Sequence, residues 1–70
     1  MEIRKGKYRH FKGSEYELID VARCSETDEI QVIYKPLYEE GGLWVRPAAM
    51  FFEQVERDGK VFDRFKYLGE

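Results

Sequence analysis

Cysteine, histidine and tryptophan each occur only once in this chain of 70 residues, as Cys24, His10 and Trp44. A single cysteine excludes an internal disulfide and a zinc site built from this chain's cysteines, and it is typical of a reducing compartment. No apolar run approaches the length of a membrane span, and residues 1–6 hold no apolar segment typical of a secretory signal. We therefore expect a cytoplasmic protein that has no membrane partner.

Residue patterns for bound cofactors are also missing. No spacing of histidine or carboxylate side chains suggests a metal site, and we predict no metal and no cofactor. The only glycine pair, Gly41-Gly42, follows two glutamates that would repel a phosphate, so it does not indicate a phosphate-binding loop. The sequence contains no internal repeat, low-complexity tract or linker, and residues 1–70 are expected to form one small domain.

Aromatic and charged residues are abundant. Aromatic side chains make up 16% of the chain, and their large area suits them to build the core of a small domain. The net charge is −2, divided into +4 over residues 1–12, −6 over residues 13–43 and zero over residues 44–70. The basic N-terminal arm suits a phosphate, whereas the acidic middle would oppose a long polyanion, so a nucleic-acid partner is less favoured.

Short alternations of apolar and polar residues, separated by polar turns, predict β-strands. The apolar pattern of the second stretch changes phase at residues 19–22, which indicates a bulged and strongly curved strand. Pro36 marks an edge or a bulge of the next strand, and Pro47 ends the strand of residues 43–46. The segment after Pro47 can form one helical turn, because proline is well tolerated at a helix start.

The clearest local signal is Asp58-Gly59 between two apolar stretches, which predicts a two-residue hairpin turn with both residues at positive φ. The register that follows pairs Arg57 with Lys60, Val55 with Phe62, Glu53 with Arg64, and Phe52 with Phe65. Opposite charges at Glu53 and Arg64 support this register. We predict a mainly β fold of five or six short antiparallel strands, arranged as a small SH3-like barrel or a rolled antiparallel sheet, with at most one or two helical turns.

Seven stretches, which cover nearly the whole chain, carry a family resemblance. They are Gly6-Lys7-Tyr8-Arg9-His10-Phe11-Lys12-Gly13, Tyr16-Glu17, Ala22-Arg23-Cys24-Ser25-Glu26-Thr27, Val32-Ile33-Tyr34, Leu43-Trp44-Val45-Arg46-Pro47, Met50-Phe51 and Arg64-Phe65. In this order they resemble a small bacterial domain-of-unknown-function family, number sixteen fifty-three (DUF1653). One departure from the family is Cys24, where the resemblance leads us to expect a histidine as often as not. The resemblance implies a cytoplasmic bacterial protein and no particular mechanism.

The residues that we predict to bind a ligand combine aromatic rings with a fixed cation. Trp44 and Arg46 are two apart and share one face of a strand that ends at Pro47. Tyr8, His10 and Tyr34 lie on strands that can neighbour it, and together the five residues would form an aromatic and basic rim. The alternative is that the rings fill the core and that Arg46 pairs with an acid such as Glu15 or Glu17.

Catalytic chemistry is a weaker interpretation. His10 would need a nucleophile, for which Cys24 or Ser25 are the candidates, but we predict that Cys24 is a buried and inert core residue. We therefore expect a non-catalytic binding or adaptor module for a protein, a peptide or a small polar ligand, present as a monomer or a weak homodimer. The alternatives are a small enzyme or regulatory domain that uses His10 and Arg46 at an anionic substrate, or a dimerising assembly protein.

Overall fold

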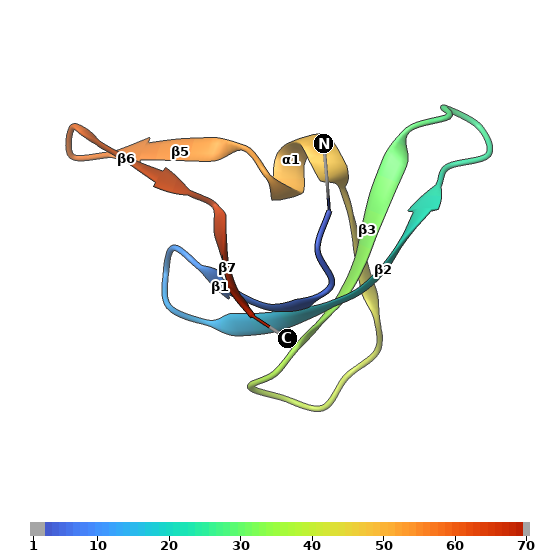
Figure 1. The fold of residues 1–70 in the computed structure, drawn as a ribbon, viewed down its shortest axis with the longest axis horizontal. Helices are drawn as coiled ribbons and strands as arrows, with labels where there is room; N and C mark the ends of the chain where they lie inside the picture. The colour runs from blue at the N-terminus through green and yellow to red at the C-terminus, as the bar shows by residue number, and fades with distance from the viewer. Residues whose placement is uncertain (1–2, 70) are drawn as a thin grey trace.

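Seven strands and one helical turn make up the fold that a computed structural model describes for residues 3–69 (Figure 1). They are β1 (Gly6–His10), β2 (Glu15–Arg23), β3 (Ile30–Pro36), β4 (Trp44–Pro47), α1 (Ala48–Phe51), β5 (Gln54–Arg57), β6 (Lys60–Asp63) and β7 (Phe65–Gly69). The predicted mainly β fold is confirmed. The number of strands exceeds the expected five or six because a bend at Arg64 divides the last segment into β6 and β7. No helix in these residues is long and apolar enough to cross a membrane.

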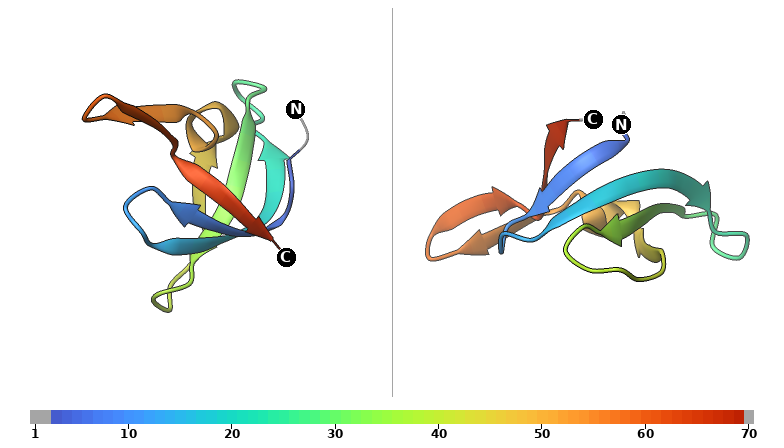
Figure 2. Two further views of the ribbon diagram at one scale, coloured as in Figure 1. Left: turned by 60° about the vertical axis from the view of Figure 1, so that its left-hand side comes forward. Right: turned by 90° about the horizontal axis from the view of Figure 1, so that it is seen from below.

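Five strands form one antiparallel sheet in the order β4-β3-β2-β1-β7, and β5 and β6 form a separate hairpin. Figure 2 shows that the sheet curls, with β2 following a long arc between β1 and β3. The architecture is therefore the rolled sheet of the two expected arrangements, with β4 and β7 as its edge strands.

The bend in β2 comes from a bulge. The register of β2 against β3 shifts between Leu18, which pairs with Tyr34, and Asp20, which pairs with Ile33. An extra residue in one strand of an antiparallel pair bends that strand and increases its twist. The change of apolar phase in the sequence thus marks the position at which the sheet turns.

The core lies between the curved sheet and α1, and it consists of six buried side chains. They are Tyr8, Leu18, Val32, Tyr34, Phe51 and Phe65. Pro47 ends β4 and directly precedes α1, which packs against β3 and β4. The single helical turn brings Phe51 into the core, where this side chain is fully buried.

The hairpin follows the predicted register through the strands. Asp58 and Gly59 have φ angles of 54° and 76°, and the strands pair from Arg57 with Lys60 to Gln54 with Asp63. Beyond them, the backbone N–H of Arg64 donates to the Glu53 carbonyl at 3.0 Å, and their side chains form an ion pair. The register does not continue to the next pair, because the chain turns into α1.

At that point it is Phe51, and not Phe52, whose ring stacks on Phe65. Phe51, the last residue of the helical turn, is buried in the core, whereas Phe52 is only partly buried and packs against the outside of the core.

Candidate functional site

Three of the predicted site residues meet where β3 and β4 pair. Trp44 lies opposite Tyr34 in the antiparallel register, and their ring centroids are 5.9 Å apart. Two residues further along β4, Arg46 donates a hydrogen bond from Nε to the Tyr34 hydroxyl at 3.3 Å. Tyr34, Trp44 and Arg46 therefore lie on one face of the sheet, as the spacing in β4 predicts.

His10 approaches the same face from β1, through Phe65. The His10 ring lies 4.9 Å from the Phe65 ring, and the Arg46 guanidinium lies 5.9 Å from the centroid of that ring. The Nδ1 atom of His10 accepts a hydrogen bond from the backbone N–H of Lys12 at 3.2 Å. Partial burial, followed by the positive charges of Arg64, Lys12 and Arg46, lowers the pKa of His10, so the neutral imidazole is favoured.

Tyr8 and Tyr34 are only 3% exposed, so their rings belong to the core. The Tyr8 hydroxyl donates to the backbone carbonyl of Arg4 at 2.7 Å. The core alternative therefore holds for these two rings. Trp44, Arg46 and His10 are the three predicted residues that keep accessible surface.

Tyr16 is a member of the cluster that sequence reasoning missed. Its ring lies 6.0 Å from Trp44, and its hydroxyl is 3.2 Å from that of Tyr38. Burial and the hydrogen bond with Tyr38 raise the pKa of Tyr16 to about 12. A signal was available, because the tight turn between β1 and β2 places Tyr16 directly across from Tyr8.

The expected ion pair of Arg46 with Glu15 or Glu17 does not form. Glu15 binds Arg9 at 3.1 Å, and Glu17 binds Lys35 at 3.8 Å. Within residues 3–69, Arg46 makes no ion pair, and its guanidinium is held by the Tyr34 hydroxyl and the face of Phe65. The cation is thus positioned by rings and is not neutralised by an acid of the described chain.

The edge strand β4 is unusually apolar and exposed. Leu43, just before β4, is 61% exposed, and Trp44 and Val45 are 40% and 62% exposed. We call these three consecutive residues the β4 edge patch. Large side chains on both faces of an edge strand are uncommon in a protein that does not use that edge.

Cys24 differs from the expectation of a buried and inert residue. It is half-buried, and it follows β2 at the start of a turn closed by the Asp28 N–H and the Cys24 carbonyl at 2.8 Å. Hydrogen bonds from the Thr27 hydroxyl and from the backbone N–H groups of Thr27 and Glu26 lower the pKa of the thiol. The whole length of β2 separates Cys24 from the end of β1, where His10 lies, so the two residues do not form a nucleophile and base.

The described residues contain no cluster of three or more His, Cys, Asp or Glu side chains that could hold a metal ion. A pocket of about 160 Å³ includes His10 in its lining together with Arg9, Phe11, Phe62, Asp63 and Lys66. Arg46 does not line this pocket. His10 and Arg46 therefore share a contact with Phe65 but do not face one common cavity there.

The chain as a whole was compared with known protein families and structures. Residues 6–67 match the family described as protein of unknown function (DUF1653). The chain is also similar to a crystal structure of a DUF1653 protein from Bordetella bronchiseptica, with 37% sequence identity and a TM-score of 0.87. That match covers 97% of this chain and 90% of the other. No curated protein matches the sequence.

Proposed function

This chain belongs to the DUF1653 family, whose function is unknown, and we propose that it is a non-catalytic module that binds an extended peptide segment of another protein along the edge of β4. The observation that carries the proposal is the β4 edge patch, in which three consecutive large apolar residues are exposed on an edge strand. An extended peptide would add a sixth strand to the sheet beside β4.

The backbone of an edge strand supplies the affinity in this mode of binding. Half of its N–H and C=O groups point away from the sheet and can pair with a new strand. The other edge strand, β7, contrasts with β4 because the exposed Lys66 stands between Phe65 and Tyr67. Lysine on an edge discourages strand addition, so β7 carries a protective residue and the β4 edge patch does not.

Trp44 and Arg46 would supply selectivity. Trp44 offers a flat apolar surface beside Tyr16, and the Arg46 guanidinium is fixed against Tyr34 and presents further N–H donors. Pro47 has no N–H to donate, so strand addition would extend from Trp44 towards Leu43. The exposed Glu39-Glu40 pair precedes this end and favours a basic residue of the peptide beside those glutamates. The rest of the peptide would have alternating apolar residues.

The enzymatic alternative requires His10 and Arg46 to act on one substrate. The pocket that His10 lines excludes Arg46, and Nδ1 of His10 already accepts the Lys12 N–H. We therefore favour binding over catalysis.

The test starts from peptides selected on the intact protein from a random display library. Binding of a selected peptide is measured by the emission of Trp44, the only tryptophan, and by fluorescence anisotropy. We expect Val45→Lys to weaken binding by about tenfold or more, the equivalent of about 1.4 kcal/mol. Val61→Lys is the matched control, because Val61 on β6 is 58% exposed and Val45 is 62% exposed.

Two further measurements separate this mode of binding from others. N-methylation of alternate amides of the peptide removes main-chain donors and should abolish binding if the peptide pairs with β4. Binding that survives both this change and Val45→Lys would overturn the proposal. Sedimentation of the wild type and of Val45→Lys tests whether a second copy of the chain occupies the edge of β4. A dimer that forms in the wild type and is lost in the variant would show that β4 pairs with a second copy.

A further inference from the structure

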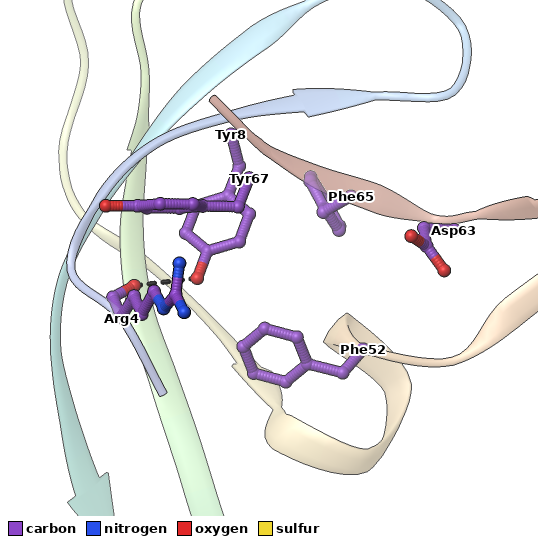
Figure 3. A pocket seen from close by; sticks show the side chains of 6 residues that line it. All are labelled: Arg4, Tyr8, Phe52, Asp63, Phe65 and Tyr67. Atoms are coloured by element: carbon purple, nitrogen blue, oxygen red, sulfur yellow. Dashed lines mark hydrogen bonds between the residues drawn. The ribbon is translucent and has the colours of Figure 1, made fainter. Parts of the chain in front are cut away.

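A second concavity lies beside β7, at the opposite edge of the sheet from β4. It has a volume of about 270 Å³ and is lined by Arg4, Tyr8, Phe52, Asp63, Phe65 and Tyr67 (Figure 3). These residues come from five places in the chain: the segment before β1, β1 itself, the residue after α1, the end of β6, and β7. The pocket therefore exists only in the folded sheet.

Aromatic rings form the walls of this pocket. The buried Tyr8 ring lies 6.1 Å from Phe52 and 5.2 Å from Tyr67, and both of these outer rings are partly exposed. Figure 3 shows Phe52 and Tyr67 on different sides of the hollow, with space between them. Such walls suit a flat, apolar molecule.

Opposite charges stand at the two ends of the pocket. The Arg4 guanidinium lies 5.3 Å from the centroid of the Tyr67 ring, and among residues 3–69 it forms no ion pair. The Asp63 carboxylate lies on the far side of Phe65 from Arg4 (Figure 3), and its Oδ1 accepts a hydrogen bond from the Gln54 side chain at 3.3 Å. Both side chains are exposed, and both keep hydrogen-bonding capacity for a ligand.

The segment that carries Arg4 is held in place by the core. The hydroxyl of the buried Tyr8 donates to the Arg4 carbonyl at 2.7 Å, so the backbone at this end of the pocket is fixed. A guanidinium that is stacked on a ring and anchored at its backbone binds a carboxylate with less loss of entropy than a free side chain would.

We propose that this pocket binds a small planar aromatic anion that carries a hydrogen-bond donor at its other end. Arg4 pairs with the anionic group, the aromatic walls enclose the ring, and Asp63 accepts from the donor. The volume lies just below the usual range of about 300–1,000 Å³ for ligand pockets, which favours a molecule with a single ring. This inference is independent of peptide binding at β4.

The probe for the test is 4-aminobenzoate, which has a carboxylate and an amine at opposite ends of one ring. Two relatives each lack one feature: 4-aminobenzamide is neutral, and benzoate has no donor. Amide chemical shifts of the ¹⁵N-labelled protein are followed up to about 10 mM probe, which detects even millimolar affinity. We expect saturable shifts at Phe52, Asp63 and Tyr67 with 4-aminobenzoate and weaker binding of each relative.

Variants assign the two ends. Arg4→Gln should weaken the binding of 4-aminobenzoate by about tenfold and abolish its preference over 4-aminobenzamide. Asp63→Ala removes both acceptor oxygens and should abolish the preference for 4-aminobenzoate over benzoate. Arg23→Gln and Asp28→Ala are matched controls, because this exposed ion pair lies at the far end of β2. Val45→Lys should leave the affinity unchanged, which separates this site from β4. No saturable shift at the pocket residues, or equal binding by the wild type and Arg4→Gln, would overturn the proposal.

Discussion

Phe51 and Phe65 stack with their ring centroids 4.0 Å apart and their planes within 1° of parallel. Phe51 lies before the β5–β6 hairpin and Phe65 lies after it. The two ends of the hairpin are therefore joined in the core, although the hairpin itself projects from the sheet (Figure 1). This stack connects the folding of the hairpin to that of the sheet.

Phe51→Ala should remove most of the stability of the protein. Truncation of a fully buried phenylalanine costs about 3–5 kcal/mol, and the core of a domain of this size rarely supplies more than about 3–5 kcal/mol of net stability. The free energy of unfolding is measured by urea titration with Trp44 emission as the signal. Met50→Ala is the control on the same helical turn, where the side chain is 45% exposed. Equal losses in the two variants would contradict the assignment of Phe51 to the core.

Gly59→Val should destabilise the hairpin by about 1–2 kcal/mol, because Gly59 has a φ of 76° and a β-branched residue resists that conformation. No atom lies within 4 Å of the position that a Cβ would occupy, so the cost comes from the backbone and not from a clash. Gly59→Asn tests this distinction, since asparagine tolerates the left-handed region. Thermal unfolding should show a lower Tm for the valine variant only, and the same loss in both would indicate a different cause.

Acid should weaken the protein through His10. The folded protein lowers the pKa of this imidazole below 6.5, so the unfolded chain takes up a proton first as the pH falls. The contribution of His10 is thus fully present above about pH 6.5 and is lost as the pH falls towards the folded pKa. The free energy of unfolding at pH 7.5 and pH 5.5 should differ in the wild type.

The difference should shrink in His10→Asn, because asparagine does not titrate in this pH range. The Asn oxygen can still accept the Lys12 N–H as Nδ1 does, so the hydrogen bond is kept. The Asp20 carboxyl, whose pKa is also lowered, titrates below 3.8 and does not contribute in this range. An identical pH dependence in the variant would assign the effect to other groups.

Local chemistry explains which parts of the fold could be predicted. Asp58-Gly59 needs only its own turn preference to define the hairpin, and the phase change at residues 19–22 reports the bulge directly. The face shared by Trp44 and Arg46 follows from the period of a strand. Each of these features depends on neighbours in the sequence.

The remainder depends on contacts between distant segments. The pairing of β1 with β7 brings Phe65 beside His10, and no pattern of neighbouring residues in the sequence predicts this pairing. The aromatic pocket around Arg4 arises from the same pairing, so the sequence pattern alone does not indicate Arg4 or Phe52 as site residues. Cys24 was placed in the core by its apolar phase, but the strand ends one residue earlier and the turn exposes the side chain.

Tyr16 should ionise late in an alkaline titration. Burial and the Tyr38 hydroxyl raise its pKa to about 12, so the absorbance of tyrosinate should rise in an early and a late phase. The neutral form is favoured by folding, and the stability that it contributes is complete below about pH 10 and is lost as the pH rises towards 12. Tyr38→Phe removes the hydrogen bond and should move the late phase to lower pH. A late phase that is unchanged would show that burial alone sets the pKa.

Cys24 should react with iodoacetamide in the native protein, contrary to its apolar position in the sequence. The side chain is partly exposed, and hydrogen bonds from Thr27 and Glu26 stabilise the thiolate and lower the pKa of the thiol. The rate of alkylation as a function of pH, followed by mass spectrometry, should give a lower pKa for the native chain than for the same chain in urea. Thr27→Val removes one of these hydrogen bonds and should raise the native pKa and slow alkylation at pH 7. Protection of the native thiol from the reagent would mean that Cys24 is buried in solution.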